Sequence, residues 1–205
     1  DLSGNGHHAI TYDSSPVLNA TGFNSKPTVA FTNDTMVLEG SATSFAEWAN
    51  FTIIMTWKVP GGHTWTTLLG RAASNNTTTN ATWLLNARRA DQNPPKYRFR
   101  VNGPSSQSTP EIHDIAMKSN NILMLSYDGS HIRAFLNGNS KIYTAFSNGL
   151  RNTSYPLSLG GESDGGSGPS INFSEIMVFK NALDNSNREI IEGYLAHKWG
   201  LSGSL

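Results

Sequence analysis

The chain has 205 residues, with 15 Lys and Arg against 15 Asp and Glu, and it contains no cysteine. This length suits one β-sandwich and no Pro/Gly/Ser-rich linker divides the sequence, so we predict a single domain over residues 1–205. The zero net charge removes the electrostatic case for nucleic acid or an anionic membrane as a partner. No apolar run approaches the roughly 20 residues of a membrane span, which argues against membrane insertion.

The first predicted elements are a turn and three strands. The stretch DLSGNGHHA forms a tight turn of Gly and Asn headed by Asp1, and residues 28–38 predict two short strands around Asn33-Asp34. From Phe51 to Lys58, large apolar residues alternate with Thr, Ile and Lys. This pattern predicts a strand with one strongly apolar face.

The middle of the chain predicts further strands joined by short turns. Residues 64–71 and 82–89 flank a polar loop, and KYRFRVNG places Tyr97 and two other apolar residues on one face and three basic residues on the other. Residues 122–128 and 131–137 are joined by Asp-Gly, and an Asn-Gly pair follows directly. Both dipeptides favour tight hairpins, so we expect three successive antiparallel strands.

The last 35 residues predict a closing strand, 174–179, and then one helix. Asp184 and Ser186 are candidate N-caps, and Ser186 with Glu189 fits a capping box. A stripe of Ile, Tyr, Leu and Trp at three- and four-residue spacing ends at Gly200, which is a typical C-terminal stop. No other segment has so clear a helical period. We therefore predict an all-β domain with one C-terminal helix packed on the edge of the sandwich.

The closing run SEIMVFKNAL, followed by EGYLAHKWGL, resembles the last strand and helix of the laminin-G-like (LamG) group of concanavalin A-like jelly rolls. DLSGNGHHA, FTIIMTWKV, ILMLSYDGSHIRAFLNG and YPLSLGG match in the same order and span nearly the whole chain. The resemblance implies a two-sheet antiparallel jelly-roll sandwich. Such modules occur on secreted enzymes, surface adhesins and virion proteins, which implies an extracellular, cell-surface or virion-surface location.

Two further expectations come from this resemblance. Family members usually carry an aromatic-rich strand before the DxSGNG motif, and its absence here predicts a piece of a longer protein. In related jelly rolls a structural calcium ion commonly ties the N-terminal turn to the closing strand. The matching ligands here are Asp1, Asn5 and Glu175, whose oxygens suit calcium. The alternative is a plain turn at Asp1 and an ordinary strand residue at Glu175.

Motifs for catalysis are missing from the sequence. The histidines lack zinc-binding spacing, and there is no G-x-S-x-G elbow and no nucleophilic cysteine. A retaining glycosidase needs two carboxylates about 5 to 5.5 Å apart, yet no apolar strand carries acids two or four residues apart. We predict that the protein is not an enzyme. A polysaccharide hydrolase or lyase with acids on different strands is the less favoured alternative.

Two non-catalytic functions fit the sequence. The first is a carbohydrate-binding or adhesion module whose partner is a glycan or glycoprotein surface. The second is a structural or decoration domain of a virion, fibre or surface layer, with other subunits of a larger assembly as partners. Eight N-x-S/T sequons leave open whether the chain is itself a glycoprotein or only rich in Asn and Thr.

Sugar sites combine an aromatic ring with charged or amide groups, and loops offer both here. The predicted ligand-binding residues are Trp65, Arg71, Arg88, Arg89, Asp91, Tyr97, Glu162 and Asp164.

Overall fold

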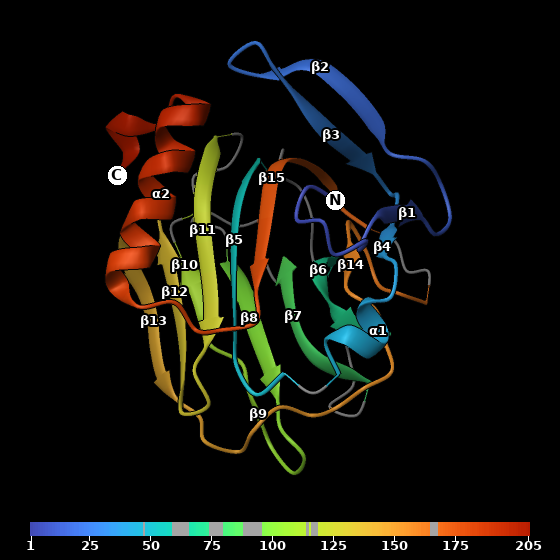
Figure 1. Cartoon of the computed structure of the whole chain (residues 1–205), viewed down its shortest axis with the longest axis vertical. Helices are drawn as coiled ribbons and strands as arrows, with labels where there is room; N and C mark the ends of the chain where they lie inside the picture. The colour runs from blue at the N-terminus through green and yellow to red at the C-terminus, as the bar shows by residue number, and fades with distance from the viewer. Residues whose placement is uncertain are drawn as a thin grey trace.

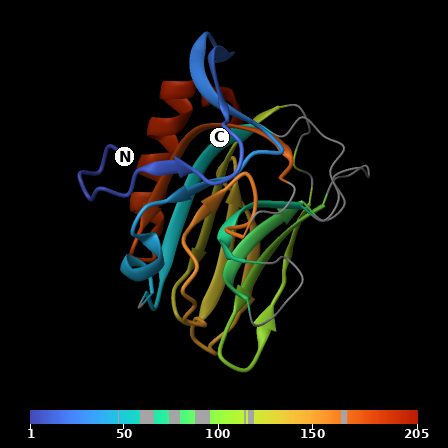
Figure 2. The ribbon, with the colours of Figure 1, turned by 90° about the vertical axis from the view of Figure 1, so that its right-hand side faces the viewer.

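The computed structural model describes residues 1–46, 48–58, 66–73, 80–87, 96–113, 115, 119–164 and 168–205. These residues form two antiparallel β-sheets packed face to face and one long C-terminal helix (Figures 1 and 2). The predicted all-β sandwich is therefore confirmed. Within the described ranges, no helix is long and apolar enough to cross a bilayer.

Seven strands form the sheet that carries the helix, which we call the helix-bearing sheet. In spatial order they are β13 (Asn139–Ala145), β12 (His131–Leu136), β11 (Asn120–Tyr127), β5 (Phe51–Lys58), β15 (Ser170–Phe179), β3 (Lys26–Thr32) and β2 (Val17–Phe23). The predicted β11–β12 and β12–β13 hairpins are present. Gly129, Asn137 and Gly138 take the positive φ angles (92°, 48° and 75°) that such tight turns require.

Eight strands form the opposite sheet. In order they are β1 (Ala9–Thr11), β4 (Met36–Leu38), β14 (Ser158–Leu159), β6 (Thr66–Ala72), β7 (Ala81–Ala87), β8 (Lys96–Asn102) and β10 (Glu111–His113), with β9 (Gln107–Ser108) beside β8. A single helical turn, α1 (Ser41–Ser44), lies between β4 and β5. The sequence analysis predicted neither α1 nor β2.

The main core lies between the two sheets. In β5, Ile53, Met55 and Trp57 point into it, as the alternating pattern predicted, and they are completely buried. Tyr97 of β8 meets Trp57 edge to face, with the ring centroids 5.5 Å apart. Because β5 is central in its sheet and also lies under the helix, its other face is buried as well.

Helix α2 (Asn185–Trp199) begins and ends where the sequence predicted, with one change in its cap. The Asp184 side chain accepts a hydrogen bond from the backbone N–H of Asn187 at 2.8 Å, so Asp184, and not Ser186, is the N-cap. Glu189 does not close a capping box at Ser186; its carboxylate accepts from Arg188 at 2.8 Å. Gly200 adopts a left-handed conformation, φ 68°, and stops the helix.

The buried stripe of α2 differs from the prediction. Arg188 and Glu192 are buried together with Leu195, Ala196 and Trp199, whereas Ile190 is 70% exposed and Tyr194 47% exposed. The two charged residues can be buried because they form an ion pair of 2.6 Å. The Arg188 guanidinium also lies 4.1 Å from the centre of the Phe135 ring. The sequence alone does not show that two charged residues of the helix will pair with each other and become buried.

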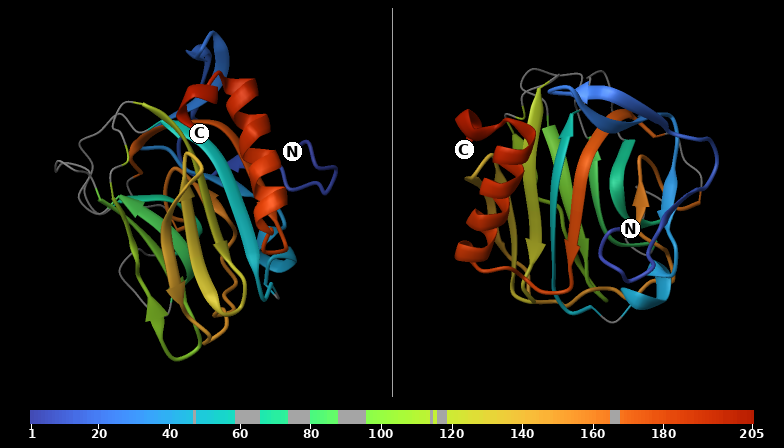
Figure 3. Two further views of the ribbon diagram at one scale, coloured as in Figure 1. Left: turned by 90° about the vertical axis from the view of Figure 1, so that its left-hand side faces the viewer. Right: turned by 45° about the horizontal axis from the view of Figure 1, so that its top comes forward.

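The helix covers the outer face of its sheet, and not the sandwich edge as expected. The pairings Phe135↔Met124, Met124↔Ile54 and Ile54↔Met177 place four apolar residues in one row across β12, β11, β5 and β15. Leu195 and Trp199 belong to the same apolar cluster as this row. Figure 3 (left) shows α2 alongside this sheet. At the top of Figure 1, the tip of the β2–β3 hairpin also reaches α2, where Phe23 stacks on Trp199 with ring centroids 5.8 Å apart.

Candidate functional site

The outer face of the opposite sheet carries polar side chains where the helix-bearing sheet carries apolar ones. The strand register places Thr67 opposite Asn86, Asn86 opposite Arg98, and Arg98 opposite Glu111. Directly opposed residues project to the same side of a sheet, so the four side chains form one line across β6, β7, β8 and β10. We call these four residues the polar row.

The polar row exists because apolar and polar residues alternate along β7 and β8. Leu85, Tyr97 and Phe99, which flank row residues in the sequence, point inward and are completely buried in the core. Burial raises the pKa of Tyr97 to about 12, so its phenol stays neutral at physiological pH. With the apolar residues fixed inward, the intervening Asn86, Arg98 and Arg100 must face outward.

One end of the polar row is tied by hydrogen bonds to the loop that follows β14. The Asn86 side-chain amide donates to the Thr67 hydroxyl at 3.2 Å, and this hydroxyl donates to the Glu162 carboxylate at 2.9 Å. The loop itself is fixed by Gly160, whose backbone N–H donates to Leu68 O. Gly160 has a φ of 76°, and an added Cβ would lie 2.3 Å from the Phe31 ring, so only glycine fits there. Glu162 is therefore held at a defined position.

Burial decreases along the polar row, from β6 towards β10. Thr67 is 1% exposed and Asn86 4%, while the Glu111 side chain is 19% exposed and that of its neighbour His113 45%. Arg100, two residues beyond Arg98 on the same face, is also buried, and this burial lowers the pKa of its guanidinium. We call the more exposed end of the row, on β8 and β10, its open end. It combines guanidinium, carboxylate and imidazole groups, all of which can hydrogen-bond hydroxyl groups.

The predicted ligand-binding residues fall into three groups. Trp65, Arg88, Arg89 and Asp91 lie outside the described residues. Glu162 takes part in the chain of hydrogen bonds at the polar row, and Asp164 is exposed two residues further on. Tyr97 is buried in the core, on the inner side of the sheet.

Arg71 is also in the interior, although it was predicted as a ligand-binding residue. It is 2% exposed, and its guanidinium donates to the backbone carbonyls of Phe45 (2.7 Å), Ala42 (3.2 Å), Thr153 (2.6 Å) and Tyr155 (3.0 Å). Two of these acceptors belong to α1 and its C-cap, and the other two lie in the loop between β13 and β14. The structure therefore gives Arg71 a part in holding these two segments together.

The residues suggested as calcium ligands have other partners. The Asp1 carboxylate accepts from Ser3 N, Ser3 Oγ and His7 N at 2.7 to 3.0 Å, which is the geometry of a capped turn. Glu175 Oε2 accepts from Trp199 Nε1 and forms an ion pair with Lys198 Nζ, both at 2.9 Å. No group of three or more His, Asp or Glu residues within the described ranges could hold a metal. Such a group contains only carboxylate and imidazole side chains, so calcium at Asp1, Asn5 and Glu175 stays an untested prediction.

The acids near the polar row are spaced too widely for glycosidase chemistry. Glu162 contacts β6, whereas Glu111 lies on β10, three strands away. Three strand spacings amount to about 14 Å. The two carboxylates of retaining and inverting glycosidases lie roughly 5 to 9.5 Å apart. Arg98 also lies between these two acids, so they cannot act on one glycosidic bond as an acid and its partner.

Thr67, Asn86 and Glu111 were not predicted from the sequence, although a signal for Asn86 was present. The alternation in KYRFRVNG already separated Arg98 and Arg100 from the apolar face. The same alternation in TWLLNA, taken with a β7–β8 pairing, would have placed Asn86 beside them. Glu111 could not be found in this way, because β10 has only three residues and no clear pattern.

Comparison with known proteins supports the fold. No protein-family model matches the chain, and no curated protein matches its sequence. Among solved structures, similar ones include the binding domain of botulinum neurotoxin serotype G, with a TM-score of 0.68 and 11% identity over 96% of this chain. The binding domain of Paraclostridial Mosquitocidal Protein 1 has a TM-score of 0.68 and 14% identity over 95%.

A third similar structure is the ligand-binding domain of botulinum neurotoxin serotype D in complex with N-acetylneuraminic acid, with a TM-score of 0.70 and 12% identity over 95% of this chain. The chain spans about half of each of these domains, namely 50%, 49% and 47%. At such low identity the likeness concerns the fold alone. The likeness therefore supports a two-sheet antiparallel β-sandwich with one C-terminal helix.

Proposed function

We propose that the protein is a non-catalytic carbohydrate-binding module of the LamG and concanavalin A-like class, and that its glycan binds at the open end of the polar row. The observation that carries this proposal is the chain of hydrogen bonds from Asn86 through Thr67 to Glu162, on the same face as Arg98 and Glu111. A row of fixed amide, guanidinium and carboxylate groups suits a ligand rich in hydroxyl groups.

Two further observations support this choice of surface. The outer face of the helix-bearing sheet is covered by α2, which leaves the opposite sheet as the sheet face for a ligand. The similar solved structures are binding domains, and one of them is in complex with a sugar acid. An extracellular, cell-surface or virion-surface location belongs to this proposal. The predicted residues Arg88, Arg89 and Asp91 belong to the sequence between β7 and β8, which starts two residues after Asn86.

A matched pair of arginine variants tests the location of the site. Arg98→Ala changes the polar row, and Arg133→Ala changes an arginine on the outer face of the other sheet, where it pairs with Asp128 at 2.6 Å. We expect the wild type and Arg133→Ala to bind the same glycans on an array. Arg98→Ala should bind at least about tenfold more weakly, because a guanidinium can give two hydrogen bonds to a sugar. The triple change of Arg88, Arg89 and Asp91 to Ala should abolish binding without altering the melting temperature.

The structural alternative gives a different result in the same experiment. A decoration domain of a virion or surface layer would bind no glycan, and light scattering would show self-assembly of the wild type. New reducing ends or unsaturated sugars released from a polysaccharide panel would instead show an enzyme. Equal loss of binding in Arg98→Ala and Arg133→Ala would contradict the polar row as the site.

A further inference from the structure

A depression of about 470 Å³ lies at the end of the sandwich where β5 begins and β11 ends. It includes Trp48 just before β5, Gly129 in the β11–β12 turn, and Ser147, Leu150 and Asn152 between β13 and β14. We call it the Trp48 depression. Phe51, close to Trp48, and Trp57, which contacts Tyr97 near the polar row, are six residues apart on β5, or about 20 Å. The two places are therefore separate.

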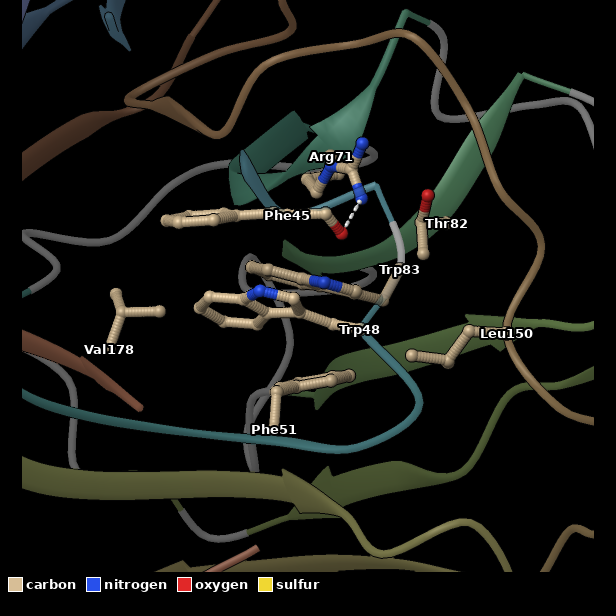
Figure 4. A pocket seen from close by; sticks show the side chains of 8 residues that line it. All are labelled: Phe45, Trp48, Phe51, Arg71, Thr82, Trp83, Leu150 and Val178. Carbon is tan, nitrogen blue, oxygen red and sulfur yellow. Dashed lines mark hydrogen bonds between the residues drawn. The ribbon is translucent and has the colours of Figure 1, made fainter. Parts of the chain in front are cut away.

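A small inner cavity lies next to the Trp48 depression, and Trp48 and Leu150 line both (Figure 4). Its volume of about 10 Å³ can hold roughly one water molecule. A ligand therefore has room only in the outer depression. Trp48 is held in place by Phe45, with the ring centroids 4.1 Å apart. The aromatic wall of the depression is thus fixed before any ligand arrives.

Arg71 joins two segments at the Trp48 depression. It donates to Ala42 O in α1 and to Phe45 O at the end of α1, and to Thr153 O and Tyr155 O on the loop that contains Asn152 (Figure 4 shows the bond to Phe45). Burial lowers the pKa of Arg71 to about 10, so the guanidinium stays protonated at neutral pH. A preformed site loses less conformational entropy on binding. Arg71 is a positioning residue for this site.

The lining of the Trp48 depression indicates an uncharged ligand. None of the described residues that line it carries a charge: they supply an indole, small and branched apolar side chains, a hydroxyl, an amide and glycine backbone. An apolar ring with an amide and a hydroxyl at its side is the combination that binds the C–H face and the hydroxyl groups of a sugar ring. A charged sugar would find no counter-ion among these groups.

We propose that the Trp48 depression is a second binding site, distinct from the polar row, and that it binds one neutral hexopyranose unit. Its volume lies in the usual range for small-molecule sites, roughly 300 to 1,000 Å³. Asn152 and Ser147 hydrogen-bond the hydroxyl groups, while Trp48 and Leu150 contact the apolar side of the ring. The two sites are independent of each other, so either can be lost without the other.

Titration of the intact 205-residue chain followed by NMR tests this proposal. The chain is made in bacteria, because Asn152 begins a sequon and must stay unmodified. The probes are the methyl glycosides of glucose, galactose, mannose and N-acetylglucosamine, with methyl glucuronide as the charged comparison. We expect at least one neutral glycoside to shift the Trp48 indole signal, which is assigned by its loss in Trp48→Phe. Methyl glucuronide should shift it less.

Variants then distinguish residues that contact the ligand from residues that only hold the site in shape. Asn152→Ala changes an exposed side chain, so the chain should fold normally and bind the glycoside roughly tenfold more weakly. Arg71→Lys keeps the charge but cannot reach four carbonyls, and it should weaken binding several-fold without touching the ligand. Arg98→Ala should leave this titration unchanged, whatever its effect at the polar row.

Three results would overturn the proposal. The first is a Trp48 signal that no neutral glycoside shifts at its highest soluble concentration. The second is a shift that Asn152→Ala leaves fully intact. The third is a Trp48 signal that moves with protein concentration alone, because the depression would then be covered by a second copy of the chain. Since Asn152→Ala does not alter a buried contact, failure of Arg71→Lys to fold does not prevent the test.

Discussion

The outer faces of the two sheets carry residues of opposite character, although both sheets have the same pleated geometry. On the helix-bearing sheet, a row across four strands is apolar, from Phe135 through Met124 and Ile54 to Met177, and α2 covers it. On the opposite sheet, a row across four strands is polar, and it ends at partly exposed Glu111. The chemistry of the outer face therefore decides which of the two sheets α2 covers. We call the covered outer face the closed face.

The largest effect should come from removing the aromatic anchor of the closed face. Trp199 is 4% exposed, stacks on Phe23 and donates its indole N–H to Glu175. Trp199→Ala should lower the free energy of unfolding by about 3 to 5 kcal/mol, as for other buried aromatic truncations. Urea unfolding measures this, with the half-exposed Tyr194→Ala on the same helix as the control. A loss below about 1 kcal/mol would mean that the helix is not needed to close this face.

The buried ion pair on the closed face gives the next effect. Arg188→Met leaves Glu192 buried without its 2.6 Å partner and should cost about 3 kcal/mol in urea unfolding. The double change Arg188→Met with Glu192→Leu should recover most of this loss, because no uncompensated charge remains. If the double variant is as unstable as the single one, the contribution of Arg188 comes from its packing on Phe135 and not from its charge.

The polar row should contribute less to stability than the closed face does. Asn86→Ala removes a buried donor to the Thr67 hydroxyl and should cost about 1 to 2 kcal/mol. The same variant should weaken glycan binding, because the Thr67 hydroxyl that donates to Glu162 loses its own donor. Asn139→Ala on an exposed hairpin is a suitable control, with little change expected in unfolding or binding. Unfolding curves and the glycan array report the two effects separately.

A smaller effect on the closed face depends on pH. Burial raises the pKa of Glu192 above its ordinary value of 4.5, and the nearby Arg188 only partly opposes this shift. The folded state therefore holds the proton more tightly, so stability should fall as the pH rises from 4.5 through the raised pKa. Thermal unfolding between pH 4 and 7 measures this slope, and Glu192→Gln should flatten it. Asp128 has a lowered pKa, so its contribution is lost on acidification and has the opposite sign.

Removal of calcium should have the smallest effect of all. Glu175 is occupied by Trp199 and Lys198, so we expect EDTA to leave the melting temperature unchanged. Elemental analysis of the purified chain provides the control. A melting temperature that falls with EDTA and recovers with added calcium would restore the predicted ion and would require Glu175 to leave Lys198.

Much of the fold could be predicted because its signals are local. The Asp128-Gly129 and Asn137-Gly138 turns require positive φ angles, and such dipeptides fix a hairpin without knowledge of the rest of the chain. Strand β2 gave no such signal. It is an edge strand whose residues are mostly exposed, so no apolar alternation marks it.

The candidate sites could be predicted only in part, because they depend on pairings between distant strands. Glu162 was identified from its loop, but its hydrogen bond with Thr67 joins residues 95 positions apart. The bond between Thr67 and Asn86 joins residues 19 positions apart. Arg71 was predicted as a ligand-binding residue because it ends a segment that also contains His63 and Trp65. Its four carbonyl acceptors come from segments on both sides of it in the sequence, and only the folded chain brings them together.

The position of α2 in the chain also has a consequence for synthesis. Every strand that it covers precedes it in the sequence, so the ribosome completes the apolar row of Ile54, Met124 and Met177 before the helix exists. Domains begin to fold as they emerge, at roughly 5 to 20 residues per second. For a short time the nascent sheet therefore exposes an apolar face that can bind a chaperone or aggregate. Chains stopped before Asn185 should be prone to aggregation, even though all their strands are present.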